Sequence, residues 1–317
     1  MKELIYPMRF IPIPKIRIWG GNKLKEIFYK DFSQTKIGES WEISTIENDV
    51  SIVSNGILKG KTLQELLEKY KECFLGNKNY KRFGNQFPLL IKFIDAADDL
   101  SIQVHPNDEL ARKRYNSFGK TEMWYVMDVE DNANLILGFN QNLSKERYQE
   151  ILNEGSIEKY LNYEKVKKGD SFFVEAGLIH AIGKGVMIAE IQQTSDLTYR
   201  VYDWNRKDVD GNERELHTDL ALDALKYEQT NNCKIIKKES NLVDSEYFIV
   251  NKFDVAQNGL IRNLLDIDSF IIYMIVEGDI KLNGNIILRK GETILFPAIY
   301  KEEIIFEGDG KVLEIYI

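Results

Sequence analysis

The chain has 317 residues, of which 44% are hydrophobic and 29% are charged, a composition typical of a soluble globular protein. That length is enough for one large or two modest domains with a substantial core. The formal net charge of −8 argues against nucleic acid or an anionic membrane as the main partner, so an anionic substrate would need a local cluster of positive side chains.

The N-terminal segment, MKELIYPMRFIPIPKI, is interrupted by prolines and has no apolar core long enough for a signal peptide. The longest apolar run, Phe270–Val276, is too short to cross a bilayer. The two cysteines, Cys73 and Cys233, belong to no C-x-x-C pair, so reduced thiols are expected rather than a disulfide. Together these features predict a cytoplasmic protein.

The first third of the chain contains strand patterns and one clear helix. Gly38–Ser44 has the alternation of a strand. Thr62 is placed to cap a helix whose apolar stripe ends at Gly76. The polar segment 77–86 is predicted to be a surface loop, and the apolar run Pro88–Ile94 a strand buried on both sides.

Polar side chains alternate with apolar ones at the start of the next strand. Because alternate residues of a strand share a face, Ser101, Gln103 and His105 are expected to point the same way. A second alternating run over residues 121–126 places Glu122 on one face of another strand. If both strands line one cavity, Gln103, His105 and Glu122 converge there.

A third element also ends in a histidine. Gly169–His180 has the pattern of a turn, a short apolar strand and a second turn at Gly177. A single strand histidine is more often structural, but two imidazoles with a carboxylate suit a divalent transition metal that keeps an open position. The spacing therefore predicts a metal site. The third histidine of the chain, His217, has no ligand-like context and is expected to be structural or solvent-facing.

The following strands carry two further charged candidates. Val186–Gln192 is an apolar strand that contains Glu190, and Tyr199–Asp203 is strand-like and carries Arg200. Residues 208–212 faintly resemble a calcium loop but lack its later acidic ligand, so a turn is expected. Many short strands with few helices indicate a β-barrel or sandwich rather than a parallel α/β sheet.

In combination, these motifs resemble a known family. Q-x-H-P, G-K-T-E-x-W-Y, G-D-x(6)-G-x-x-H and EIQQTSDLTYRVYDW are similar to motifs of the type I mannose-6-phosphate isomerases, above all of their short bacterial form. The similarity extends from Trp19-Gly20-Gly21 to Trp204. It implies a metal-dependent cupin with one zinc ion per chain. The ligands implied are Gln103, His105, Glu122 and His180.

The resemblance further implies a bicupin: a mainly β protein of two double-stranded β-helix (jelly-roll) barrels, with a few helices inserted in or flanking the first. Gly291–Pro297 reproduces the spacing of Gly169–Glu175 but lacks a histidine at the expected offset. We therefore expect a catalytic metal-binding domain over residues 1–235 and a metal-free domain over 236–317. Glu175 stands where cupins usually have proline, which should reduce the rigidity of the turn without removing the His180 ligand.

The activity implied is the interconversion of mannose 6-phosphate and fructose 6-phosphate through an enediol(ate). Zinc can polarise the substrate oxygens while a base moves a proton between adjacent carbons. The expected partner is a small sugar phosphate, with no nucleic acid or membrane and with the chain as a monomer or homodimer. By resemblance the catalytic candidates are Arg200, Glu190 (proton transfer) and Lys120, and the substrate-binding candidates are Ser101 (phosphate) and Arg206.

Two other classes of function remain open. Two histidines and one carboxylate are also the ligands of non-haem iron, so a cupin oxygenase is the alternative enzyme. Gln103 as a fourth ligand disfavours it, because oxygen chemistry needs more open positions. A sugar-binding cupin without catalysis is the other alternative, and the intact set of His105, Glu122, His180 and Arg200 disfavours it. Metal content together with an isomerase assay separates the three.

Overall fold

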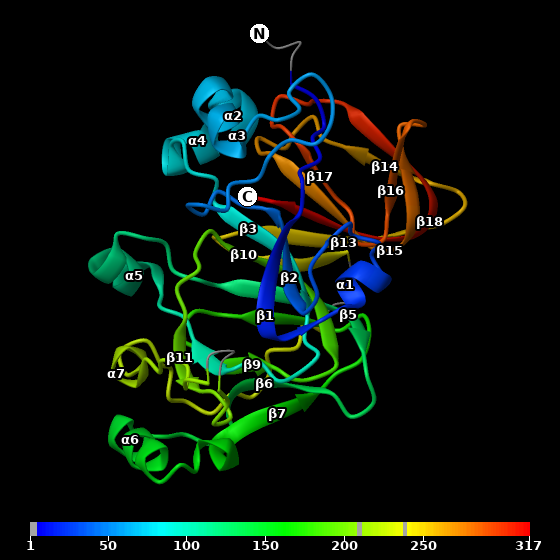
Figure 1. Ribbon diagram of the computed structural model, residues 1–317. Coiled ribbons are helices and arrows are strands. Elements are labelled where there is room, and N and C mark those ends of the chain that lie inside the picture. Colours follow the sequence, from blue (N-terminus) through cyan, green and yellow to red (C-terminus); the bar gives the residue numbers. More distant parts are fainter. Residues whose placement is uncertain (1–4, 208–210, 237–239) are drawn as a thin grey trace.

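The computed structural model describes residues 5–207, 211–236 and 240–317, and β-strands dominate it (Figure 1). Part of the predicted turn at 208–212 and residues 237–239, next to the predicted domain boundary, lie outside the described residues. The strands form three antiparallel sheets, which confirms the prediction of a mainly β protein. No helix in the described ranges is both long and apolar enough to cross a membrane.

Two of the sheets come from the first two thirds of the chain. The first has the order β1-β2-β3-β10-β5-β8 and the second the order β11-β4-β9-β6-β7. Their strands are β1 Ile13–Gly21, β2 Ile37–Ile43, β3 Leu89–Asp95, β4 Ile102–Val104, β5 Glu122–Val129, β6 Asn134–Phe139, β7 Leu161–Lys165, β8 Ser171–Val174, β9 His180–Ile182, β10 Val186–Gln193 and β11 Tyr199–Tyr202.

The third sheet is built from residues after 240 alone. It has the order β12-β13-β18-β15-β16, with β14 paired to β18 and β17 paired to β15. Its interior has its own apolar core, which includes Tyr273, Leu288 and Phe306. The strands are β12 Asn241–Asp244, β13 Ile249–Val255, β14 Leu260–Asn263, β15 Ile271–Leu282, β16 Ile286–Arg289, β17 Thr293–Phe296 and β18 Glu303–Tyr316.

The first sheet is the middle layer of the molecule, between the other two (Figure 1). Alternate residues of β5 pack to opposite sides, as the pleat of a strand requires. Trp124 and Val126 pack with Leu135 of the second sheet. Met123 and Tyr125 belong instead to the core that contains Leu313 of the third sheet. The polar site described below opens on the side of the first sheet that faces the second.

The helices are short and lie around the sheets. Thr62 caps α2 as predicted, with both hydrogen bonds of a capping box to Glu65. The helix does not run unbroken to Gly76, because Lys71 has a positive φ of 47° and separates α2 from α3. The helices are α1 Lys23–Glu26, α2 Leu63–Tyr70, α3 Glu72–Leu75, α4 Asn77–Phe83, α5 Asp108–Tyr115, α6 Lys145–Asn153 and α7 Thr218–Ala221, with a 3-10 turn at Ile157–Tyr160.

The predicted surface loop at 77–86 is wrong, because α4 occupies most of it. The side chain of Asp268 accepts hydrogen bonds from the backbone N–H groups of Asn77, at 3.0 Å, and Lys78, at 3.3 Å. These are N–H groups that a helix leaves unsatisfied at its start. A carboxylate nearly two hundred residues later in the chain therefore completes the N-terminus of this helix, and no local pattern could indicate it.

Candidate metal centre and adjoining cavity

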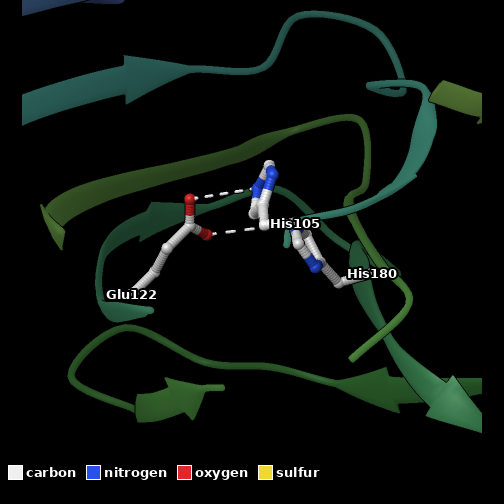
Figure 2. A group of neighbouring side chains, drawn as sticks. All are labelled: His105, Glu122 and His180. Carbon is white, nitrogen blue, oxygen red and sulfur yellow. Dashed lines mark ion pairs between the residues drawn. The ribbon is translucent and has the colours of Figure 1, made fainter. Parts of the chain in front are cut away.

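The candidate metal ligands lie at the ends of three different strands, which bring them together (Figure 2). His105 follows β4, Glu122 begins β5 and His180 begins β9. Within the second sheet, β4 pairs with β9 so that Gln103 lies opposite His180. Glu122 comes from the first sheet, so the site forms where the two sheets face one another.

The donor atoms of His105, Glu122 and His180 all lie within 4.8 Å of one another, and each residue is about 1% exposed. His105 Nε2 is 3.3 Å from Glu122 Oε1, and His180 Nε2 is 3.8 Å from Glu122 Oε2 (Figure 2). Among the described residues, this is the group of three or more histidine, cysteine or acidic side chains that could hold a metal ion.

Backbone carbonyls determine which imidazole nitrogen can act as a ligand. Nδ1 of His105 is 2.9 Å from the carbonyl oxygen of Leu197, and Nδ1 of His180 is 2.9 Å from that of Leu178. A carbonyl oxygen only accepts hydrogen bonds, so each Nδ1 carries the proton and each Nε2 keeps a free lone pair. Metal-binding histidines are usually oriented in this way.

The protonation states also suit a metal. Burial, together with the Lys120 ammonium, lowers the pKa of His105 to about 3, and burial lowers the pKa of His180. Burial works to raise the pKa of Glu122, but Lys120, His105 and His180 together outweigh it and hold that pKa well below the usual value. Two neutral imidazoles and one carboxylate are therefore available at neutral pH, a donor set that fits a divalent transition metal.

Two of the other predicted residues lie against this group. Gln103 Nε2 is 3.4 Å from His180 Nε2. Lys120 Nζ is 2.7 Å from Glu122 Oε1 and 3.1 Å from His105 Nε2. A positive charge therefore lies directly against two of the candidate donor atoms. Because it contacts the donor atoms directly, Lys120 adjoins any metal held there.

A cavity of about 460 Å³ opens beside the metal-ligand group. Five residues that the sequence analysis singled out line it: Ser101, Gln103, Lys120, Glu190 and Arg200. Trp19, from the WGG motif, lines it as well. Arg206 is not among the lining residues. The remaining lining residues are Lys15, Arg17, Glu39, Trp41, Asp49, Lys92, Ile94, Leu100, Ile182, Asp196, Thr198 and Arg214.

Several charged lining residues were missed by the sequence analysis. Lys15, Arg17 and Trp19 occupy every second position of β1 and so share one face of the strand. This period-two pattern could have indicated a polar strand face. Lys92 is the single charge in the run PLLIKFI, and an unexplained charge in a buried strand is itself a signal. Arg214 lies in a loop, where no local pattern indicates its position.

Glu190 is buried and held from two sides. Its Oε1 lies 3.0 Å from Lys92 Nζ, and its Oε2 accepts a hydrogen bond of 2.9 Å from the indole N–H of Trp124. Burial and the nearby charge of Glu122 raise the pKa of Glu190 above its ordinary value, with Lys92 opposing them. A carboxylate whose pKa is raised in this way is a better base near neutral pH than an exposed one.

Arg200 and Arg206 belong to a cluster of positive charge beside the cavity. Arg200 Nη1 donates to the carbonyl oxygen of Glu215 at 2.7 Å, while its buried Nε has no hydrogen-bond partner among the described residues. Arg206 Nη2 and Arg214 Nε donate to the buried carboxylate of Asp203 at 2.7 Å and 2.6 Å. Burial and the charge of Arg214 lower the pKa of Arg200. Arg206 also lies 3.5 Å from the carboxylate of Asp98. Arg200 and Arg214 line the cavity, where their positive charge suits an anion.

Known proteins share both the sequence and the fold. Residues 8–133 match the family model described as the phosphomannose isomerase type I catalytic domain. The chain is 37% identical over 302 residues to mannose-6-phosphate isomerase ManA of Bacillus subtilis, covering 92% of this chain and 93% of that protein. It is 36% identical over 306 residues to mannose-6-phosphate isomerase of Streptococcus mutans, covering 94% of each chain.

The fold agrees with these similarities. The crystal structure of a mannose 6-phosphate isomerase from Bacillus subtilis superposes with a TM-score of 0.88 at 34% identity, covering 99% of this chain and 100% of that chain. The likeness therefore spans all three sheets and the strand ends that carry the candidate ligands.

Proposed function

The chain belongs to the type I mannose-6-phosphate isomerases, and from that premise we propose how its cavity interconverts mannose 6-phosphate and fructose 6-phosphate. It is an aldose–ketose isomerase. The observation that supports the proposal most is the buried group of His105, Glu122 and His180, which lies next to a cavity lined by Lys120, Glu190 and Arg200.

The metal is proposed to be zinc, one ion per chain. His105, Glu122 and His180 would hold it, because two neutral imidazoles and a carboxylate are a zinc donor set, and Gln103, whose side chain lies against His180, would be the fourth ligand. When bound, the ion would supply electrophilic stabilisation to the oxygens of the substrate while an enediolate develops.

The residues of the chain would handle the proton and the charge. The reaction moves one proton between adjacent carbons, so a base must reach both from one face. We assign this to Glu190, which lines the cavity and is held by Lys92 and Trp124. Lys120 adjoins the ligand atoms, where its ammonium can stabilise a developing oxyanion.

The phosphate is proposed to bind toward the arginines. Arg200 lines the cavity and has a buried Nε that no described residue satisfies, and a phosphate oxygen or the enediolate would satisfy it. Ser101 lines the same cavity and is proposed to contact the phosphate with its hydroxyl. Arg206 lies outside the lining, and we propose that it favours substrate binding through the charge it adds around Asp203.

We also propose a domain organisation, a cellular location and an oligomeric state. We propose a catalytic domain over residues 1–235 and a second, metal-free domain over 236–317, whose sheet and core are described above. The free thiols of Cys73 and Cys233 suit a cytoplasmic enzyme, and the net charge of −8 suits one without nucleic-acid partners. The enzyme is proposed to act as a monomer or homodimer.

One experiment tests the central proposal. Purified protein is assayed for fructose 6-phosphate formation from mannose 6-phosphate, before and after dialysis against a chelator and again after zinc is restored. Activity that is lost with the metal and regained with zinc supports the proposal, and unphosphorylated mannose serves as the substrate control. A metal-loaded protein without isomerase activity would overturn it.

A further inference from the structure

One indole N–H lies between two buried carboxylates. Trp124 Nε1 is 2.9 Å from Glu190 Oε2 and 3.1 Å from Glu122 Oε2, and Trp124 is 1% exposed. The same ring meets His180 edge-on, with ring centroids 5.4 Å apart. Trp124 therefore contacts two candidate metal ligands and the candidate base at once.

The sheet register determines this position. Trp124 follows Glu122 by two residues on β5, so their side chains share a face of the strand. On the neighbouring strand β10, Glu190 lies directly opposite Trp124. The ring packs in the core between the first two sheets, with Val126 and Ile188 among its neighbours in that cluster. The ring is thus buried in a packed core with its N–H directed at the two carboxylates.

A buried indole N–H needs one acceptor, whereas the N–H of Trp124 lies within hydrogen-bond distance of two carboxylates. Indole is a donor and never an acceptor, so its N–H can stabilise carboxylates but cannot compete with them for a cation. Its hydrogen bond engages Glu122 Oε2 and leaves Oε1 on the side of His105 Nε2 and Lys120 Nζ. The second oxygen of Glu190, Oε1, is engaged by Lys92.

We propose that Trp124 is a positioning residue, which through one shared N–H orients Glu122 toward the metal and Glu190 toward the substrate. The proposal rests on the proposed metal site and isomerase activity. Loss of the N–H leaves two like-charged buried carboxylates without their common donor, and partners of this kind affect metal affinity or activity by about 10- to 100-fold.

Two variants separate the N–H from the packing. Trp124→Phe keeps an aromatic ring but removes the N–H and some volume. Benzothienylalanine, incorporated at position 124, keeps the shape of the indole and replaces its N–H by sulfur. Phe172→Leu is the matched packing control, because Phe172 lies opposite Trp124 on β8 and belongs to the same core cluster.

Metal affinity is measured by competition between the protein and a chromogenic chelator for Co²⁺, whose visible spectrum also reports the geometry of the site. We expect both position-124 variants to bind Co²⁺ with an affinity lower by about 10-fold or more and with an altered spectrum. They should also lower kcat by a larger factor than they raise KM. Phe172→Leu should lower thermal stability and leave affinity and spectrum near those of the wild type.

A benzothienylalanine variant with wild-type affinity, spectrum and kcat would overturn the proposal and reduce Trp124 to a packing residue. Equal losses in Phe172→Leu and the position-124 variants would do the same. Because the Co²⁺ measurement involves no turnover, it decides the role of Trp124 toward the metal even if isomerase activity proves absent.

Discussion

Lys120 Nζ lies 2.7 Å from Glu122 Oε1, so an ammonium group directly contacts a carboxylate that is proposed to hold the metal. The same nitrogen is 3.1 Å from His105 Nε2. A lysine that served only to pair with Glu122 would strengthen the ligand group. A catalytic lysine would instead lie beside the same donor atoms of Glu122 and His105 as the metal ion, and the two positive charges would repel each other. The two roles predict opposite effects on metal affinity.

We predict that Lys120→Met lowers kcat by about 100-fold or more, because a charge that stabilises the transition state is lost. The affinity for zinc should stay the same or rise, since a competing cation is removed. Steady-state kinetics and metal titration on one preparation test this. Lys113→Met, in an exposed position on α5, is the control. Metal lost together with activity would show that Lys120 mainly supports the ligands.

Replacing both candidate imidazoles, as in His105→Ala with His180→Ala, should abolish binding of about one divalent metal per chain. Metal analysis after dialysis measures the occupancy. The matched control is His217→Ala, which removes the third histidine, located away from the group, and should leave the occupancy unchanged. Undiminished metal in the double variant would exclude this site.

Arg200→Ala should lower turnover by about 100-fold or more while the metal stays bound, because the Arg200 guanidinium lines the cavity and donates to the carbonyl oxygen of Glu215 rather than to a candidate ligand. Arg206→Ala should act mainly on KM, since Arg206 contributes charge through Asp203 rather than from the cavity wall. Kinetics with parallel metal analysis distinguish them, and Arg289→Ala on the exposed part of β16 is the control. Near-normal kcat in metal-replete Arg200→Ala would make this arginine structural.

Glu39 predicts a pH dependence of stability. Burial alone would raise its pKa, but Lys92 and Arg17 together lower it to about 2. A folded-state pKa below the unfolded value stabilises the fold above about pH 4.5, and this contribution is lost as the pH falls toward 2. Glu39→Gln should therefore destabilise the protein by about 3 kcal/mol at pH 7, and by clearly less at pH 3.

Urea unfolding of both proteins at the two pH values measures this difference. Glu68→Gln, on the exposed side of α2, is the control and should change the free energy of unfolding little at either pH. A wild-type-minus-variant difference that stays constant from pH 7 to pH 3 would contradict the depressed pKa of Glu39.

Loss of a buried carboxylate in the third sheet should lower the stability of the fold. Glu314 is fully buried and accepts hydrogen bonds from Arg262, Asn251 and Tyr273. Glu314→Ala should lower the free energy of unfolding by about 2–4 kcal/mol, because Arg262 loses its partner. The metal affinity of the folded protein should be unchanged. Arg262→Leu with Glu314→Leu should recover part of the loss, and full stability in Glu314→Ala would contradict the structural role.

Local sequence determined much of this protein. The period-two alternation around Gln103 and Glu122, and the turn before His180, predicted the strand ends that carry the ligand group. The capping box at Thr62 was equally readable. These features depend on backbone geometry and on the alternation of side chains along a strand. Both act over a few residues, so a short segment of sequence is enough to predict them.

Only the tertiary structure decided the rest. The start of α4 is completed by Asp268, nearly two hundred residues away along the chain. The shared N–H of Trp124 exists because β10 pairs with β5 in a register that sets Glu190 opposite the ring. Arg214 reaches the cavity from a loop. A shift of one residue in the pairing of β10 with β5 would turn Glu190 to the other face, and that register is determined by packing across the whole sheet rather than by any local segment.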